Sequence, residues 1–303
     1  MNTMIKYAYI LYLLIVTMPL SSLHAEERVW GLEVNLTKHT YILHEPIWLD
    51  VTLTNNSSDT MRTHGLDAPN YRGFGIEVRD VNGDLLRYTG AMYTFTGGPG
   101  RLLLKSGEQD ADSFNLLELY GLYDANSGYR ILNWVFPYIP AGMYSVKVCF
   151  EDAVSNELTF EIVNPSGEER EVLELIAEAS GVYAQDNSGP SVEKFRDIVE
   201  KYPHNVFAEE CYYFARANSP QAYEELRQGT FDRKSFNEEM LMKYPNSGRT
   251  RGLLTAVTWE LDDSAKMDVF NSIIEEKAHT RAARYAKLER DRLLRKQERD
   301  TGE

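Results

Sequence analysis

The residue types that most often carry out chemistry are present in this sequence, but their spacing matches no familiar active site or metal site. His39 and His44 are five residues apart, so their side chains point to opposite sides of an extended chain, and only a folded arrangement with His64 would bring three histidines together. The glycine-rich stretch 96–100 lacks the Lys-Ser/Thr pair and the following helix of a phosphate-binding loop. No serine lies in a Gly-x-Ser-x-Gly nucleophile elbow. We therefore predict a protein that is not an enzyme and that holds no metal and no cofactor.

Aromatic residues provide the best candidate for a binding surface. The alternation of the chain puts Trp48 on the face opposite Ile47 and Leu49, and the stretch 88–134 is rich in Gly and Tyr. Exposed aromatic rings can stack on sugars or anchor a protein partner. The alternative is that they cover the open end of the N-terminal domain or contact the C-terminal domain, both described below, because large aromatic side chains are normally buried. The candidates are Trp48, Tyr120, Tyr123, Tyr129 and Trp134.

The first 25 residues have the organisation of a secretory signal peptide. Lys6 precedes an apolar run from Tyr7 to Leu20, and small and polar residues lead to Ala25. The apolar run is shorter than the roughly 20 residues that cross a bilayer. We expect cleavage after Ala25, with an uncleaved anchor as the alternative. The mature protein is then periplasmic or secreted and has no membrane span.

The charge distribution argues against nucleic-acid binding. The chain carries a net charge of −14, although its last 23 residues, 281–303, hold 8 basic and 5 acidic side chains. An acidic body repels phosphate backbones. We expect 281–303 to form a charged helical extension. It is either a solvated, salt-bridged helix or an arm that holds an acidic partner, an anionic lipid surface or the acidic body of this protein.

The first half of the chain has the alternating pattern of half-buried strands. Apolar residues recur at every second position in 30–36, 47–53, 74–78, 144–150 and 158–162, and Asn82-Gly83 is typical of a tight hairpin turn. Strands separated by turns, with no helical period among them, predict an antiparallel β-sandwich over residues 26–163.

Three segments of this half carry a resemblance to a known family. Tyr41–Asn55, Lys105–Glu108 and Pro140–Tyr144 resemble the second, middle and last strands of bacterial immunoglobulin-like domains. Macroglobulin-type domains and small secreted proteinase-inhibitor sandwiches share this outline. The resemblance implies a fold and says little about activity. The stretch 88–134 is longer than a compact domain of this kind needs.

The second half changes to helical spacing. Ser166 and Glu169 have the spacing of a capping box at a helix start. Apolar residues then recur three and four positions apart, most clearly between Phe195 and Tyr202, where Pro203 ends the helix. We predict an all-α domain over residues 166–280.

Two Lys-Tyr-Pro marks, about 42 residues apart, suggest an internal repeat of helical hairpins. The pattern resembles the tetratricopeptide repeats of bacterial envelope proteins, which bind peptides or neighbouring proteins. The second unit departs from this pattern, since Thr250 stands where Ala is expected. The signature residues are Phe195, Tyr202, Pro203, Ala208, Phe236, Tyr244 and Pro245.

Two cysteines raise the question of a disulfide. Cys149 lies in a predicted strand and Cys211 in a predicted helix, so a bond would join the two halves in an oxidising compartment. The alternative is plain packing of Cys211 on the apolar helix face. Sequence alone does not show whether the two Cα atoms approach closely enough.

Together these patterns predict an all-β sandwich domain followed by an all-α helical-hairpin repeat domain, behind a signal peptide. The function that fits two such modules is a non-enzymatic, exported protein-interaction adaptor of the cell envelope or the secreted space. A carbohydrate-binding module that uses exposed aromatic residues, or a secreted proteinase inhibitor, is the alternative. The sequence does not indicate the identity of the partner or the oligomeric state.

Overall fold

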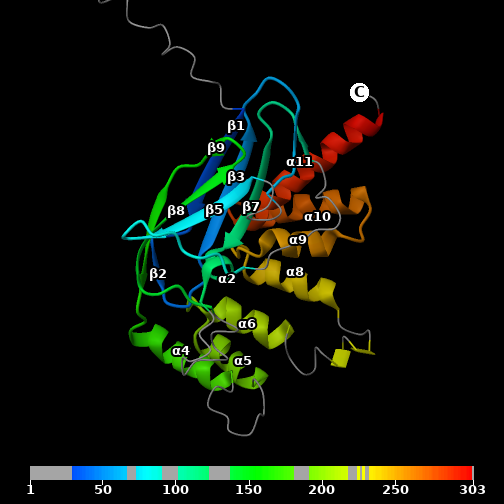
Figure 1. Ribbon diagram of the computed structural model, residues 1–303. Helices are drawn as coiled ribbons and strands as arrows, with labels where there is room; N and C mark the ends of the chain where they lie inside the picture. The colour runs from blue at the N-terminus through cyan, green and yellow to red at the C-terminus, as the bar shows by residue number, and fades with distance from the viewer. Residues whose placement is uncertain are drawn as a thin grey trace, which may run out of the picture.

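The computed structural model describes residues 29–66, 73–90, 102–122, 137–180, 191–217, 224–225, 227–228 and 232–301 (Figure 1). The predicted signal peptide, 1–25, lies outside these residues, as do the candidate side chains of Tyr123, Tyr129 and Trp134. Of the described residues, 42% are helical and 27% lie in strands.

The strands belong mainly to the first half of the chain. They are β1 (Trp30–Leu36), β2 (Thr40–Ile42), β3 (Trp48–Asn55), β4 (Met61–Thr63), β5 (Phe74–Asp80), β6 (Leu102–Leu104), β7 (Gln109–Asn115), β8 (Gly142–Phe150), β9 (Ala153–Val154) and β10 (Leu158–Val163). Sheet A has the antiparallel order β1-β3-β7. Sheet B has the order β2-β10-β8-β5, with β9 beside β8 and a parallel pair between β10 and β2. The short strands β4 and β6 form a separate pair.

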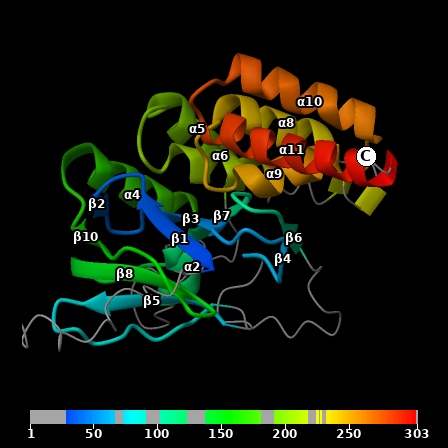
Figure 2. The ribbon, with the colours of Figure 1, turned by 90° about the horizontal axis from the view of Figure 1, so that it is seen from above.

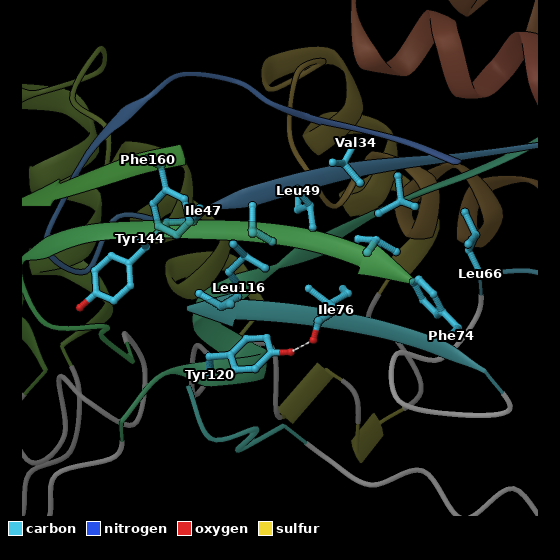
Figure 3. Close-up of a cluster of buried hydrophobic side chains, with 14 of the residues drawn as sticks. Val34, Ile47, Leu49, Leu66, Phe74, Ile76, Leu116, Tyr120, Tyr144 and Phe160 are labelled. Atoms are coloured by element: carbon cyan, nitrogen blue, oxygen red, sulfur yellow. Dashed lines mark hydrogen bonds between the residues drawn. The ribbon is translucent and has the colours of Figure 1, made fainter. Parts of the chain in front are cut away.

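The two sheets share one apolar core. The alternating pattern predicts correctly which side chains point inward: Val34 and Leu49 come from sheet A, and Ile76 and Phe160 come from sheet B (Figure 3). After β5 the chain reverses at Gly83, which has a φ of +84°, so that Leu85 pairs with Arg79. The Asn82-Gly83 turn is therefore confirmed as a tight reversal.

The helices are α2 (Leu116–Tyr120), α4 (Gly167–Ala179), α5 (Val192–Lys201), α6 (Ala208–Ala217), α8 (Arg233–Lys243), α9 (Thr250–Thr258), α10 (Asp263–Glu276) and α11 (Arg281–Thr301). Side chains of Ser191, Asp232 and Asp262 cap the starts of α5, α8 and α10 by accepting a hydrogen bond from the backbone N–H three residues on. Ser166 precedes α4 as predicted but makes no capping hydrogen bond through its side chain.

The helices form two apolar clusters. Helices α4, α5 and α6 pack around Val172, Phe195 and Phe207 at one end of the sheets. Helices α8 to α11 pack around Met240, Leu254, Phe270 and Tyr285 and form a layer over the outer face of sheet A (Figure 2). Ala111 of β7 belongs to this second cluster, so the helical core and sheet A are continuous.

The predicted fold class, an all-β sandwich domain followed by an all-α repeat domain, is wrong. The protein is a mixed α/β structure with several small sheets, and α9 and α11 contact sheet A directly through Arg251, Arg281 and Arg292. The strand alternation shows that one face of β3 is polar, but a polar face need not be solvated. Here that face, with Asp50 and Thr52, is covered by α11, whose first turn carries Arg281 and Arg284.

Candidate functional site: a cleft beside Trp259

Among the described residues, the aromatic candidates from the sequence are structural. The ring of Trp48 lies against the backbone of Gly248, where an added Cβ would come within 1.8 Å of the indole, and the Arg249 guanidinium sits 5.6 Å from the ring centroid. Tyr120 is 4% exposed, and its hydroxyl donates to the carbonyl oxygen of Ile76 in the core (Figure 3). Trp48 thus contacts the helices, which was the alternative to a ligand platform, and Tyr120 is not a surface residue.

The residues of the repeat signature lie in two helical hairpins whose first helices end with matching backbone angles. Tyr202 ends α5 with φ −127° and ψ 56°, and Tyr244 ends α8 with φ −125° and ψ 62°. Six residues after each tyrosine, Ala208 and Thr250 are both buried at the start of the following helix.

The contacts between and within these hairpins show what the signature does. Phe195 and Phe236 are buried, and the Tyr244 hydroxyl donates to the carbonyl oxygen of Ala208 at 3.4 Å. Pro203 and Pro245 follow the two tyrosines, and the carbonyl oxygen of Pro245 accepts from the backbone of Ala282 at 2.9 Å. These residues therefore shape and join the hairpins, and the described contacts do not gather them into a ligand site.

A layer of charged side chains joins sheet A to the helices. Arg281 donates to Asp50 at 2.9 Å, and Arg284 donates to the hydroxyl of Thr52 at 2.7 Å. Asp110, which is 1% exposed, pairs with Arg292 and lies 3.6 Å from Arg251. Of the roles considered for residues 281–303, contact with the acidic body of this protein is the one that the described contacts of α11 support.

Two carboxylates in or near this layer have perturbed ionisation. Burial raises the pKa of Asp112 to about 6, and the nearby Asp110 adds to the increase, whereas Arg251 opposes it. Burial and the adjacent Glu210 raise the pKa of Glu209 to about 6. Perturbed carboxylates can mark catalytic sites, but each of these is held by an arginine or serine in a packed interface, as structural ion-pair networks also are.

An exposed tryptophan marks the most distinctive surface feature. Trp259 follows the end of α9 and is 76% exposed. It borders a cleft of about 390 Å³ between α9, α10 and α11. Buried apolar side chains of all three helices line the cleft, namely Leu254, Phe270 and Leu293. Large apolar side chains are usually buried, so an exposed Trp beside an apolar cleft makes this surface the candidate binding site.

The rim of the cleft is charged. Asp263 pairs with Lys296 at 3.1 Å and lies 4.0 Å from Lys266, so two lysines share one carboxylate. On α11, Glu289 pairs with Arg292, which also pairs with Asp110 of β7, an edge strand of sheet A. An apolar centre with a polar, charged rim is the usual anatomy of a protein-binding surface.

Trp259 is not among the binding residues predicted from the sequence, although a signal is present. The apolar stripe of α9 consists of Leu253, Leu254 and Val257, and helical spacing places Trp259 outside it. A large aromatic residue outside the stripe and just before an Asp-Asp helix cap is a candidate for exposure. Trp259 lines the same cleft as residues of α11, and spacing along the chain does not reveal such tertiary proximity.

Other candidates from the sequence do not form a site in the described residues. Cys149 and Cys211 are both free, and burial raises the pKa of the Cys211 thiol. No group of three or more His, Cys, Asp or Glu residues in the described part of the chain could hold a metal ion. Within those same residues, no helix has the length and apolar character needed to cross a membrane.

Comparisons with known proteins do not identify a family. No protein-family model and no curated protein matches the chain. A mutant β-glucosidase from Listeria innocua in complex with laminaribiose aligns with 44% of this chain and 16% of its own at 14% identity and a TM-score of 0.26. The CARDB domain of a Pyrococcus furiosus protein aligns with 45% of this chain and 94% of its own at 12% identity and a TM-score of 0.24.

A third solved structure, the alkylpurine DNA glycosylase AlkC of Pseudomonas fluorescens bound to DNA, aligns with 44% of this chain and 30% of its own at 12% identity and a TM-score of 0.26. These TM-scores are too low to support an argument about fold or function. The resemblances to immunoglobulin-like domains and to tetratricopeptide repeats therefore stay predictions.

Proposed function

We propose that this protein is an exported, non-enzymatic adaptor that binds another protein through the cleft beside Trp259. The observation that carries the proposal is the 76% exposure of this indole at the edge of a cleft of about 390 Å³. Tryptophan is strongly enriched among the residues that dominate binding energy at protein interfaces, where it fills a pocket or caps one.

The surroundings of the cleft favour a protein partner over a sugar. Carbohydrate sites present aromatic rings for stacking, but Trp48 packs on Gly248 and Tyr120 is in the core. The cleft beside Trp259 combines one ring with apolar side chains and at least five charged groups on its rim, namely Asp263, Lys266, Glu289, Arg292 and Lys296. This composition resembles a protein interface, with its apolar centre and polar rim.

The fold gives the cleft a firm base. Arg292 lines the cleft and pairs with the buried Asp110, and Arg251 of α9 donates to Asp112. Both helices that carry these arginines are thereby tied to sheet A. A site built on anchored helices loses less conformational entropy on binding than one built on loops, which favours a docking role.

The test is site-specific photo-crosslinking in the cells that make and export the protein. A photoreactive amino acid replaces Thr255, an exposed residue that lines the cleft. The matched control places it at Val81, which is 77% exposed and directly follows β5, a strand that lies apart from α9, α10 and α11 in both views of the fold (Figures 1 and 2). A third strain carries the Thr255 probe together with Trp259→Ala.

We expect one protein to be captured reproducibly from position 255, not from position 81, and to be lost with Trp259→Ala. Capture of the same species from both positions would indicate chance encounters. Recovery of glycan alone, or of no species from position 255, would remove the support for an adaptor that uses this cleft.

A further inference from the structure

We infer that the partner segment received by this cleft presents an apolar side chain next to an Asp or Glu carboxylate. This inference rests on the proposed function and adds the chemistry of the ligand. It follows from which groups of the rim already have partners of opposite charge and which donors are left at the surface.

The apolar part of the ligand follows from the lining of the cleft. Leu254, Phe270 and Leu293 lie behind the rim, and Trp259 stands beside them with most of its surface in water. A Leu, Met or Phe side chain that enters between Trp259 and these residues removes apolar surface of both partners from water. A purely polar ligand would leave that surface exposed and would gain little.

The acidic part of the ligand follows from the charges. Among the residues that line the cleft, Lys266, Arg292 and Lys296 outnumber Asp263 and Glu289. Both carboxylates are already paired, Asp263 with the two lysines and Glu289 with Arg292. A cation from a partner would have to displace those pairs.

The lysines can accept a second anion more easily. The Lys296 side chain is 54% exposed, and its ammonium carries three donors, of which Asp263 uses one at 3.1 Å. Lys266 lies at the longer distance of 4.0 Å from the same carboxylate. A carboxylate that arrives beside them completes an alternating arrangement of charges, since each lysine then lies between two anions.

A second copy of this chain is a less suitable occupant. The chain carries a net charge of −14, so two copies repel each other at long range. A partner segment with an apolar residue and a single carboxylate carries far less negative charge, so this repulsion is weaker and the lysines at the rim attract it at short range. Self-association is therefore treated as one outcome of the test.

The experiment selects peptides from a library of random 12-residue sequences displayed on phage, with the protein purified after export as the target. Fluorescence anisotropy then gives the dissociation constants of labelled synthetic copies of the enriched peptides. The variants are Trp259→Ala, Lys296→Glu and Lys266→Glu, and Val81→Ala is the control of equal exposure on another face. Circular dichroism verifies that each variant folds.

We expect enriched peptides that place Leu, Met or Phe within one or two positions of Asp or Glu. Trp259→Ala weakens their binding at least about tenfold, and Val81→Ala leaves it unchanged. Lys296→Glu weakens it several-fold, and replacing the peptide carboxylate by Lys restores part of the affinity in this variant only. Such a reciprocal exchange identifies the charge pair directly.

Enrichment of basic peptides, binding that does not depend on Trp259, or concentration-dependent dimers that Trp259→Ala abolishes would each overturn the inference. These results are separable from failure of the proposed function. A protein captured from position 255 together with basic peptides would leave the adaptor standing and refute only the acidic ligand. Absence of any captured protein would refute the adaptor itself.

Discussion

The substitution Asp110→Ala tests whether the charged layer holds the helices on sheet A. Asp110 is 1% exposed, and its carboxylate accepts a hydrogen bond from the backbone of Leu66 at 3.0 Å. The same carboxylate pairs with Arg292 of α11 and lies 3.6 Å from Arg251 of α9. The alanine variant removes all three interactions and leaves two arginines in a partly buried interface.

The expected loss of stability follows from these contacts. Breaking a buried ion pair by removing one partner costs about 3–5 kcal/mol, because the other charge stays buried without compensation. Arg292 keeps Glu289 and Arg251 keeps Asp112 as partners, so the cost should lie near the lower end. We expect Asp110→Ala to reduce the free energy of unfolding by about 3 kcal/mol. Asp110→Asn retains an oxygen for Leu66 and should lose about 2 kcal/mol.

The assay is equilibrium unfolding in urea, followed by far-ultraviolet circular dichroism, with Asp59→Ala as a control at an exposed carboxylate. The free energies come from linear extrapolation to zero denaturant. A loss of less than about 1 kcal/mol for Asp110→Ala would mean that the layer contributes no more than surface ion pairs do. That result would refute the claim that these charges fasten the helices to the sheet.

Three further predictions concern the same interface and the core beside it. Gly248→Ala places a Cβ where the Trp48 ring lies, so we expect a destabilisation of about 1–3 kcal/mol in urea unfolding. In a protein that already carries Trp48→Ala, Gly248→Ala should cost much less, because the ring that it clashes with is gone. The folded-state pKa of Asp112 is raised to about 6, so protonation of this carboxyl favours the folded state. The stabilisation that comes from this protonation increases as the pH falls from about 6 towards 3.8, and it is absent above about 7. Asp112→Asn should therefore flatten the dependence of the free energy of unfolding on pH between 6 and 4, whereas an unchanged slope would assign the dependence to other groups. A maleimide reagent should label Cys149 in the folded protein and Cys211 only after unfolding, because Cys211 is fully buried and burial raises the pKa of its thiol; mass spectrometry of the labelled peptides checks this.

Local patterns located five of the ten described strands and the ends of two helices. Alternation located β1, β3, β5, β8 and β10, and helical spacing with the Tyr-Pro marks located the ends of α5 and α8. Each of these signals depends on neighbours within one strand or one or two turns of helix, where periodicity directly reports which side chains are buried.

The arrangement of the elements could not be read in the same way. Asp50 and Arg281 are 231 residues apart, and their pairing depends on how α11 returns to sheet A. A polar strand face and a basic helix are each consistent with solvent exposure, so residues 281–303 were predicted to form a charged extension. Their complementary charges were the available hint, but charge alone does not choose between an internal contact and an external partner.

The sequence likewise does not distinguish a covered tryptophan from an exposed one. Trp48 and Trp259 are both tryptophans outside an apolar stripe, and the sequence treats them alike. Trp48 is covered because Gly248, without a side chain, lets the turn between α8 and α9 approach its ring. The structure provides no comparable cover for Trp259 among the described residues, where the indole stays 76% exposed.

Arg292 belongs to both the cleft and the charged layer. Its side chain lines the cleft, and its guanidinium pairs with Glu289 and with the buried Asp110. A carboxylate that bound Arg292 would have to compete with Asp110 and would weaken the attachment of α11 to sheet A. A carboxylate that binds Lys266 and Lys296 leaves that attachment intact, because both lysines pair with Asp263 at the rim. An acidic ligand should therefore bind at the lysines and keep the helices fixed on the sheet, so that the protein holds its partner on a rigid surface.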